Sequence, residues 1–259
     1  MAHKTLIGGT AYEVIGGKTL IGGTAYKIAK GRTLVNGTGY DITFETVEDM
    51  LDELFSTMTI VEEEITNAAA NYLEITAVAN SYYLYTAPVF QDYPAISLSY
   101  FDGTTCTLIW DIFPSTHDGR SGVGYNSANN TIYPIHGSTH TPENYGQNIS
   151  RVTFTVDPAE LLSHLSMFDW SASDSSTSET QYVSYANRTN PSYYICRVTG
   201  YSLIYKLKDG VLTALYSDPN AVTDPCLYLS TSNTRIYYSL DGTSSAKGRG
   251  VLAGFNFTP

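Results

Sequence analysis

Basic residues are missing from a long stretch of this 259-residue chain. Residues 33–119 contain no lysine or arginine but fourteen acidic residues, whereas residues 1–32 hold five basic residues and one acidic residue. The formal net charge is −11. A chain with this distribution repels a phosphate backbone, so nucleic acid is excluded as a partner class. The two oppositely charged segments either keep the protein soluble or meet oppositely charged neighbours in an assembly.

Cysteines and long apolar runs are also scarce. The three cysteines, Cys106, Cys196 and Cys226, are an odd number at wide spacing, which argues against a disulfide framework and a four-thiolate zinc site. We expect free thiols. No apolar run approaches the roughly 18 residues of a membrane helix, and the N-terminus lacks the apolar core of a secretory leader. We therefore expect no membrane span and synthesis in the cytosol.

What the sequence has in abundance is tyrosine, at 22 positions, with only 15% charged residues. This composition suits strands better than helical bundles. We predict a mainly β fold with three parts: β-hairpin repeats over residues 1–45, one helix over 46–75, and a β-sandwich or jelly-roll-like domain over 76–259.

The first 45 residues repeat with a period of 14. The units are KTLIGGTAYEVIGG, KTLIGGTAYKIAKG and RTLVNGTGYDITFE. Gly-Gly or Asn-Gly in the middle of each unit is typical of a two-residue hairpin turn, so each unit predicts one hairpin. Strands this short bury too little surface alone, which indicates an attachment module that docks on its own copies or on another molecule. The recurring positions expected to make the assembly contacts are Leu6, Tyr12, Leu20, Tyr26, Leu34 and Tyr40.

A helical period follows the repeats. Thr46 and Asp49 resemble a capping box with a shorter acid. Apolar residues then recur at alternating spacings of four and three, which is typical of a coiled-coil seam and predicts a homotrimer. The seam positions assigned to oligomerisation are Val47, Leu51, Leu54, Met58, Val61 and Ile65. The alternative is an amphipathic helix that lies on its own β-domain, with a break where β-branched residues gather near Ile60.

The rest of the chain alternates strands and turns. Asp102-Gly103 and Asp209-Gly210 each predict a hairpin, and Asp157 followed by Pro158 predicts a second, short helix. We expect nine to twelve strands. The long polar segments 114–149 and 171–180 are typical of binding loops on a β scaffold.

Tyrosine pairs recur in the predicted strands. They are Tyr82 and Tyr83, Tyr182 and Tyr185, Tyr193 and Tyr194, and Tyr237 and Tyr238. In a strand such pairs place rings in the core or outward, where they supply contact area for protein or sugar.

We find no convincing catalytic constellation and predict no enzyme, cofactor or metal. His117, His136 and His140 with Asp118 offer metal-ligand types, but their spacing is diagnostic only on a helix, and Gly137 makes this segment a loop. Acidic pairs for glycoside cleavage have only default candidates. These are Asp111, Asp118, Glu143 and Asp169.

The three N-terminal units resemble Gly-Thr-Ala-Tyr repeats found near the start of virion proteins of tailed bacteriophages. The resemblance covers about 42 residues and implies a non-enzymatic structural component of the virion. In that class the repeats contact other virion proteins while the β-rich part projects, as in a tail fibre, a baseplate protein or a capsid decoration. Two alternatives remain open: a module that binds a host-surface carbohydrate or protein receptor, and a virion-associated polysaccharide or cell-wall hydrolase.

Overall fold

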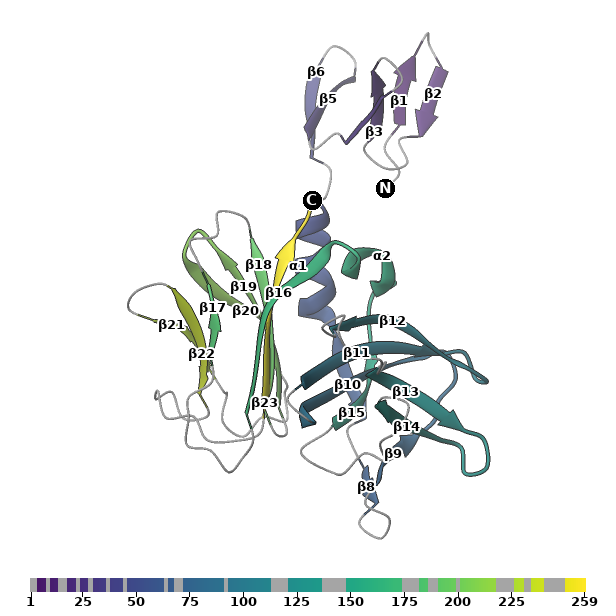
Figure 1. Cartoon of the computed structure of the whole chain (residues 1–259). Coiled ribbons are helices and arrows are strands. Elements are labelled where there is room, and N and C mark those ends of the chain that lie inside the picture. The colour runs from purple at the N-terminus through teal and green to yellow at the C-terminus, as the bar shows by residue number, and fades with distance from the viewer. Residues whose placement is uncertain are drawn as a thin grey trace. The chain divides into compact units, whose positions relative to one another are not determined.

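The computed structural model divides the chain into two compact units, Met1–Met50 with Pro259, and Leu51–Thr258. The residues that the structure describes are 4–7, 10–13, 18–21, 24–27, 30–35, 38–43, 46–62, 65–67, 72–90, 93–112, 121–136, 148–173, 182–185, 191–198, 201–217, 226–230, 234–239 and 250–259. These residues form antiparallel sheets with two helices (Figure 1). The prediction of a mainly β chain is confirmed.

Each N-terminal repeat contributes one antiparallel pair of strands. The pairs are β1 (Lys4–Ile7) with β2 (Thr10–Glu13), β3 (Lys18–Ile21) with β4 (Thr24–Lys27), and β5 (Lys30–Val35) with β6 (Thr38–Thr43). The register is equivalent in all three, with Thr5 opposite Tyr12, Thr19 opposite Tyr26, and Thr33 opposite Tyr40. The side chains of the six recurring positions lie outside the described part, so their role in assembly stays a prediction.

The helix after the repeats is shorter than predicted. Helix α1 spans Val47–Thr57, and strands β7 (Thr59–Glu62), β8 (Ile65–Asn67) and β9 (Tyr72–Thr76) occupy most of the remaining range to residue 75. The prediction of a helical seam through Val61 and Ile65 is wrong, because these residues lie on β7 and β8. β-branched residues cluster after Thr57, and such side chains lose rotamer freedom in a helix but pack well in a strand.

The start of α1 confirms the predicted capping box. The Thr46 hydroxyl oxygen accepts a hydrogen bond from the Asp49 amide at 3.1 Å, and the Asp49 carboxylate accepts one from the Thr46 amide at 2.9 Å. Two amide groups that the helix itself leaves unsatisfied thus gain partners. Helix formation from residue 46 onward is therefore specified locally, without the repeats.

The first half of unit Leu51–Thr258 is a pair of sheets around a shared core. One sheet has the order β12-β11-β10-β15-β7 and the other β13-β14-β9-β8. The additional strands are β10 (Ser81–Phe90), β11 (Tyr93–Phe101), β12 (Cys106–Ile112), β13 (Ser121–Asn126), β14 (Thr131–His136) and β15 (Asn148–Thr153). Tyr83 and Tyr85 of β10 are fully buried in this core with Phe101 and Ile132, whereas Tyr82 points to the opposite face of the sheet.

The second half is another pair of sheets. Their orders are β16-β23-β18-β19-β20 and β17-β22-β21. The strands are β16 (Leu165–Ser173), β17 (Tyr182–Ser184), β18 (Ser192–Val198), β19 (Tyr201–Lys208), β20 (Val211–Ser217), β21 (Cys226–Leu229), β22 (Arg235–Ser239) and β23 (Gly250–Phe257). Tyr194, Ile236, Tyr238 and Leu252 form the centre of its core. Strands β9 to β23 thus outnumber the nine to twelve predicted for this part of the chain, and they pack as two sheet pairs within the one compact unit Leu51–Thr258.

Helix α1 covers the outer face of the five-stranded sheet of the second pair (Figure 1). The Phe55 ring lies 5.6 Å from the ring of Tyr193 on β18. Asp52 accepts a hydrogen bond from the Tyr193 hydroxyl at 2.7 Å and forms an ion pair with Lys206 of β19. Because this sheet is covered on both faces, the adjacent residues Tyr193 and Tyr194 are both fully buried.

The apolar stripe of α1 is buried by this packing against the β-domain. Leu51, Leu54 and Met58, three of the positions assigned to oligomerisation, are buried within a single chain. Val47 is half-buried, and Val61 is exposed on β7. The structure therefore corresponds to the alternative in which an amphipathic helix lies on its own β-domain. The predicted trimer would need contacts elsewhere.

The turns and the helix cap that the sequence predicts occur in the structure at the predicted residues. Strands β19 and β20 pair across Asp209 and Gly210, which have φ values of 51° and 76°, as a turn with two left-handed residues requires. Strands β11 and β12 pair on either side of Asp102-Gly103. Helix α2 (Pro158–Leu162) begins at Asp157, whose carboxylate accepts a hydrogen bond from the Ala159 amide at 3.0 Å. Both predicted hairpins and the short helix are confirmed.

The cysteines that the structure describes with side chains are free thiols. Cys196 is fully buried on β18 and Cys106 is half-buried on β12. Burial, followed by the negative charge of Asp102, raises the pKa of the Cys106 thiol to about 11. Burial also raises the pKa of Cys196. Both are therefore protonated and weakly nucleophilic at neutral pH.

Gly254, in the middle of β23, is required by close packing. A Cβ atom at this position would lie 2.6 Å from Cζ of Phe168 and 3.0 Å from Cε1 of Tyr194. Both rings pack at the second core, so relief requires displacement of an aromatic side chain. We expect Gly254→Ala to lower the free energy of unfolding by about 1–3 kcal/mol. Urea denaturation checks this, with Gly122→Ala as the control, because a Cβ atom at Gly122 would meet its nearest neighbours at an ordinary 3.7 Å. Equal stabilities of Gly254→Ala and wild type would contradict the packing.

Candidate functional site

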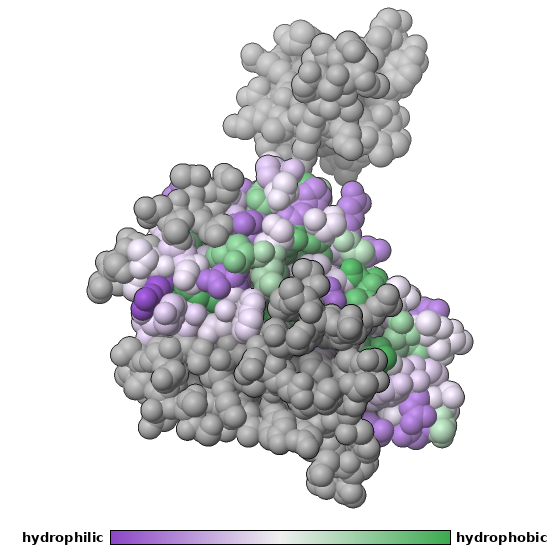
Figure 2. All heavy atoms as spheres, in the orientation of Figure 1, coloured by the Kyte–Doolittle hydropathy of each residue, from purple (hydrophilic) through white to green (hydrophobic). Residues whose placement is uncertain are grey.

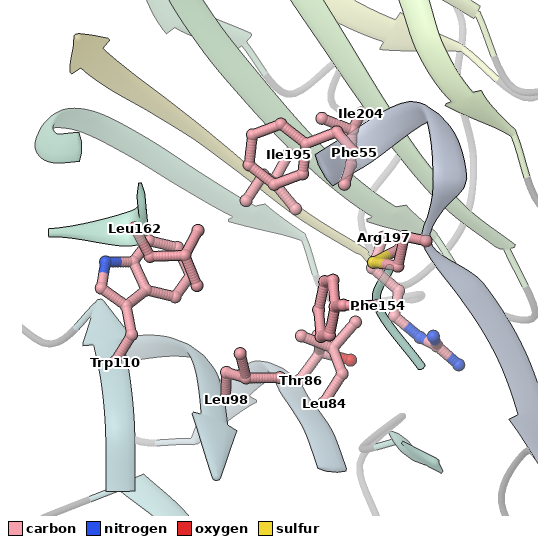
Figure 3. A pocket seen from close by; sticks show the side chains of 11 residues that line it. Phe55, Leu84, Thr86, Leu98, Trp110, Phe154, Leu162, Ile195, Arg197 and Ile204 are labelled. Carbon is pink, nitrogen blue, oxygen red and sulfur yellow. The ribbon is translucent and has the colours of Figure 1, made fainter. Parts of the chain in front are cut away.

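An apolar cavity lies between the two sheet pairs, and it is too small to be a binding site. Leu84, Leu98 and Trp110 project into it from the first sheet pair, and Ile195 and Ile204 from the second (Figure 3). Phe55, Met58, Thr86, Phe154, Leu162 and Arg197 complete the lining. Its volume of about 30 Å³ admits about two water molecules. The cavity is therefore a gap in the packing that joins the two sheet pairs.

The candidate metal ligands fall largely outside the described residues. This applies to His117, Asp118 and His140, and to the side chain of His136. Glu143, a candidate acid for glycoside cleavage, also lies outside the described residues, as do large parts of the predicted loops 114–149 and 171–180. Within the described part, no group of three or more His, Cys, Asp or Glu side chains is arranged to hold a metal ion. No described helix is long and apolar enough to span a membrane.

Two of the default acidic candidates are visible. Asp111 lies half-buried on β12. Asp169 on β16 accepts hydrogen bonds from the backbone amides of Trp170 at 2.9 Å and Ser184 at 2.5 Å. The Asp169 carboxylate thus joins β16 to β17, which is a structural role.

Apolar residues are scattered over the described surface. On the face that Figure 2 shows, hydrophobic residues (green) form small patches among hydrophilic ones (purple). Exposed large apolar or aromatic side chains occur on several strands and in the turn before α2. They are Val61, Leu108, Tyr133, Ile135, Tyr182 and Val211 on strands, and Val156 in the turn. Tyr182 differs from the others because it belongs to a cluster of aromatic rings with a cation.

This cluster lies on the outer face of the sheet β17-β22-β21. Tyr182 lies opposite Tyr237, which lies opposite Tyr228, so the three tyrosines form one row across the strands. The alternate residues Val183, Ile236 and Leu227 point into the core beneath. We call Tyr182, Tyr237, Tyr228 and Arg235 the tyrosine row.

The rings of the row contact one another. The ring centroids of Tyr182 and Tyr237 are 5.5 Å apart with an interplanar angle of 54°, and those of Tyr237 and Tyr228 are 5.4 Å apart at 17°. Tyr182, at one end, is 38% exposed, while Tyr237 and Tyr228 are half-buried. Contacts of this kind hold each ring in place before any ligand arrives.

Arg235 is the cation of the tyrosine row and lies against the side chains of Tyr182 and Tyr237. Its Cζ atom is 4.1 Å from the centroid of the Tyr182 ring, which is cation–π geometry. A hydrogen bond with the Tyr237 side chain, followed by the charge interaction with Tyr182, raises the pKa of Arg235 above its ordinary value. The Arg235 side chain is exposed, so a cation held by two tyrosines faces solvent.

Hydrogen bonds around Arg235 hold the backbone of the sheet. The Ser230 hydroxyl accepts from the amides of Thr234 and Arg235, each at 3.2 Å, and the Ser230 amide donates to the Arg235 carbonyl at 2.9 Å. The Tyr185 amide donates to the Thr234 carbonyl at 2.6 Å. The backbone at the start of β22, which carries Arg235, is thus hydrogen-bonded to Ser230 on one side and to Tyr185 on the other.

Sequence reasoning found part of this site. It singled out Tyr182 and Tyr237 as rings that lie in the core or outward, and the structure places both outward while Tyr185 and Tyr238 are buried. It missed Tyr228 and Arg235. Alternation along each strand was the available signal for orientation, but the contact between Arg235 and Tyr182 joins residues far apart in the sequence.

Comparison with protein-family models, curated proteins and solved structures finds no match for this chain. The geometry and the repeats are therefore the basis for assigning a function.

Proposed function

We propose that this protein is a non-enzymatic structural component of a tailed-bacteriophage virion, attached through residues 1–45. The observation that carries the proposal is the arrangement of three repeats in equivalent register, followed directly by a separate compact unit. Short two-stranded pairs are marginal in water, which favours their docking on other virion proteins or on copies of this chain. The unit Leu51–Thr258 has its own cores and is what such an anchor would display.

A homotrimer is part of this proposal, although α1 no longer supports it. Because the apolar stripe of α1 packs within the chain, the contacts between copies would come from the repeats or from other surfaces. Within the virion, the protein would belong to a tail fibre, to a baseplate or to the decoration of the capsid.

A second candidate function is supported by the tyrosine row. Tyr and Arg, with Trp, are enriched among the residues that contribute most to binding at recognition surfaces. Here Tyr182 and Arg235 are exposed and in contact, and Tyr237 is half-buried beside them. This favours a module that binds a carbohydrate or a receptor on the host surface. It is compatible with the first candidate, since a displayed unit of a virion protein is where such a surface would act.

Mass spectrometry of purified particles tests the first candidate. We expect the chain to co-purify with the particles through a density gradient in a fixed ratio to the major capsid protein. A non-structural phage protein from the same lysate is the control and should be lost. If the chain is abundant in infected cells and absent from the particles, it is not a virion component.

A further inference from the structure

We propose that the tyrosine row binds a polysaccharide whose sugars carry carboxylates, with Arg235 holding a carboxylate and Tyr182 and Tyr237 contacting sugar rings. This rests on the second candidate function, recognition of a surface ligand, and names the ligand class.

Charge on this sheet favours an anionic ligand. Strands Tyr182–Ser184, Cys226–Leu229 and Arg235–Ser239 contain no aspartate or glutamate, and Arg235 is their only charged residue. A guanidinium has five N–H groups in a planar fork that matches the two oxygens of a carboxylate. Stacking on the Tyr182 ring fixes the plane of the fork.

The net charge of −11 does not override this local cation. At physiological ionic strength the electrostatic screening length is about 8 Å, so acids several residue diameters away contribute little at the site. One described acid lies near the site: the Asp169 carboxylate accepts a hydrogen bond from the amide of Ser184, which lies opposite Arg235. This carboxylate is already engaged by the amides of Trp170 and Ser184, so the ligand's carboxylate contacts mainly the Arg235 guanidinium and its tyrosine neighbours. Binding should weaken as salt is added.

The shape and chemistry of the row favour a sugar polymer over a protein. On β17 and β22 the outward-facing side chains that the structure describes are Tyr182, Ser184, Arg235 and Tyr237, and none of these four is aliphatic. Every one of them carries a polar group beside any apolar surface, as a sugar ring does. Tyr237 and Tyr228 stack on each other at 17°, so a sugar ring would contact the exposed part of Tyr182 and the edge of Tyr237.

Fixed side chains lower the cost of binding. Ordering a mobile side chain on complex formation costs about 0.5–1.5 kcal/mol, and this cost is reduced where the rings and the guanidinium already hold one another. The tyrosine row is thus prepared for a ligand before contact.

Titration of the full-length chain with oligogalacturonate, oligomannuronate and glucuronate oligosaccharides, followed by calorimetry, tests the proposal. We expect at least one of these uronates to bind, and its carboxyl-reduced counterpart to bind about ten-fold more weakly, as is typical for loss of a charge-assisted hydrogen bond. Arg235→Gln should weaken uronate binding by a similar factor and leave binding of the reduced oligosaccharide unchanged. Arg235→Lys should be intermediate, because an ammonium lacks the planar fork.

Tyr182→Ala should weaken both oligosaccharides by about five-fold, since it removes the ring under Arg235. Tyr133→Ala is the matched control: Tyr133 is 37% exposed, against 38% for Tyr182, but lies on β14 of the other sheet pair. Its effect should stay within about two-fold. Thermal melting of each variant verifies the fold.

The proposal is overturned if none of the uronates binds, or if Arg235→Gln and Tyr133→Ala act alike. It is also overturned if Tyr182→Ala impairs attachment to a protein and to none of the uronates, which would assign the row to a protein partner. Incorporation into particles separates the two levels of the argument. A chain found in particles that binds no uronate refutes only the ligand, whereas a chain absent from particles refutes the virion proposal whatever it binds.

Discussion

A chain that lacks residues 1–45 is expected to fold and yet to be almost absent from purified particles. Folding should survive because the capping box of α1 begins at Thr46 and because both cores lie in Leu51–Thr258. Incorporation should fall by about 100-fold or more, since three linked contacts bind far more tightly than any one of them. Quantitative mass spectrometry of particles complemented with the truncated chain measures this loss.

An internal deletion provides the matched control for this truncation. Removal of residues 16–29 takes out one period of 14 residues with β3 and β4, and keeps all the residues of the pairs β1-β2 and β5-β6. We expect incorporation between that of the full chain and that of the truncated chain. Normal incorporation of a chain without residues 1–45 would refute the anchor assignment, and the remaining unit would then have to carry the attachment.

Phe55→Ala is expected to lower the free energy of unfolding by about 3–5 kcal/mol. Phe55 is 3% exposed, its ring contacts Tyr193, and it lines the cavity between the two sheet pairs. Its loss would enlarge a cavity whose walls come from both halves, so they cannot close easily over the space. A typical domain is stable by only about 5–15 kcal/mol, so this one change removes a large share.

Urea denaturation followed by tryptophan fluorescence measures the effect of Phe55→Ala. Trp110 lines the same cavity and lies 5.0 Å, between ring centroids, from Phe255, so its emission reports on this region. Val211→Ala is the control, since Val211 is 62% exposed on the edge strand β20 and its loss should change stability by less than about 0.5 kcal/mol. If Phe55→Ala is no more harmful than Val211→Ala, helix α1 does not hold the two halves together.

Local signals predicted local structure well. Asp209-Gly210, the cap at Asp157 and the capping box at Thr46 each behave as predicted, because a turn or a helix start depends on a few neighbouring residues. The prediction of a helix over residues 46–75 is wrong beyond Thr57, because periodicity over a longer range depends on tertiary packing as well as on neighbouring residues. A spacing of four and three predicts a helix through Ile65, but the β-branched cluster after Thr57 and the pairing of β7 with β15 favour a strand.

The candidate site was harder to foresee. Because side chains alternate along a strand, the two residues of each adjacent tyrosine pair point to opposite faces of the sheet. This alternation does not show which of the two faces is covered by another element. Tyr193 is buried because α1 lies over it, whereas Tyr182 and Tyr237 face solvent although their strands alternate in the same way. No sequence pattern marks Arg235, because its place in the site comes from its contact with the Tyr182 ring, which lies far away along the chain.

The sequence by itself determined the mainly β composition, the period of the repeats, the positions of the turns and the helix starts, since all of these depend on residues close together in the chain. The tertiary structure decided that α1 packs inward, that the strands form two sheet pairs, and that a cation stands on a row of tyrosines. These features depend on contacts between residues that lie dozens of positions apart or more. Such contacts form only where the whole chain buries enough apolar surface to offset the entropy of ordering it.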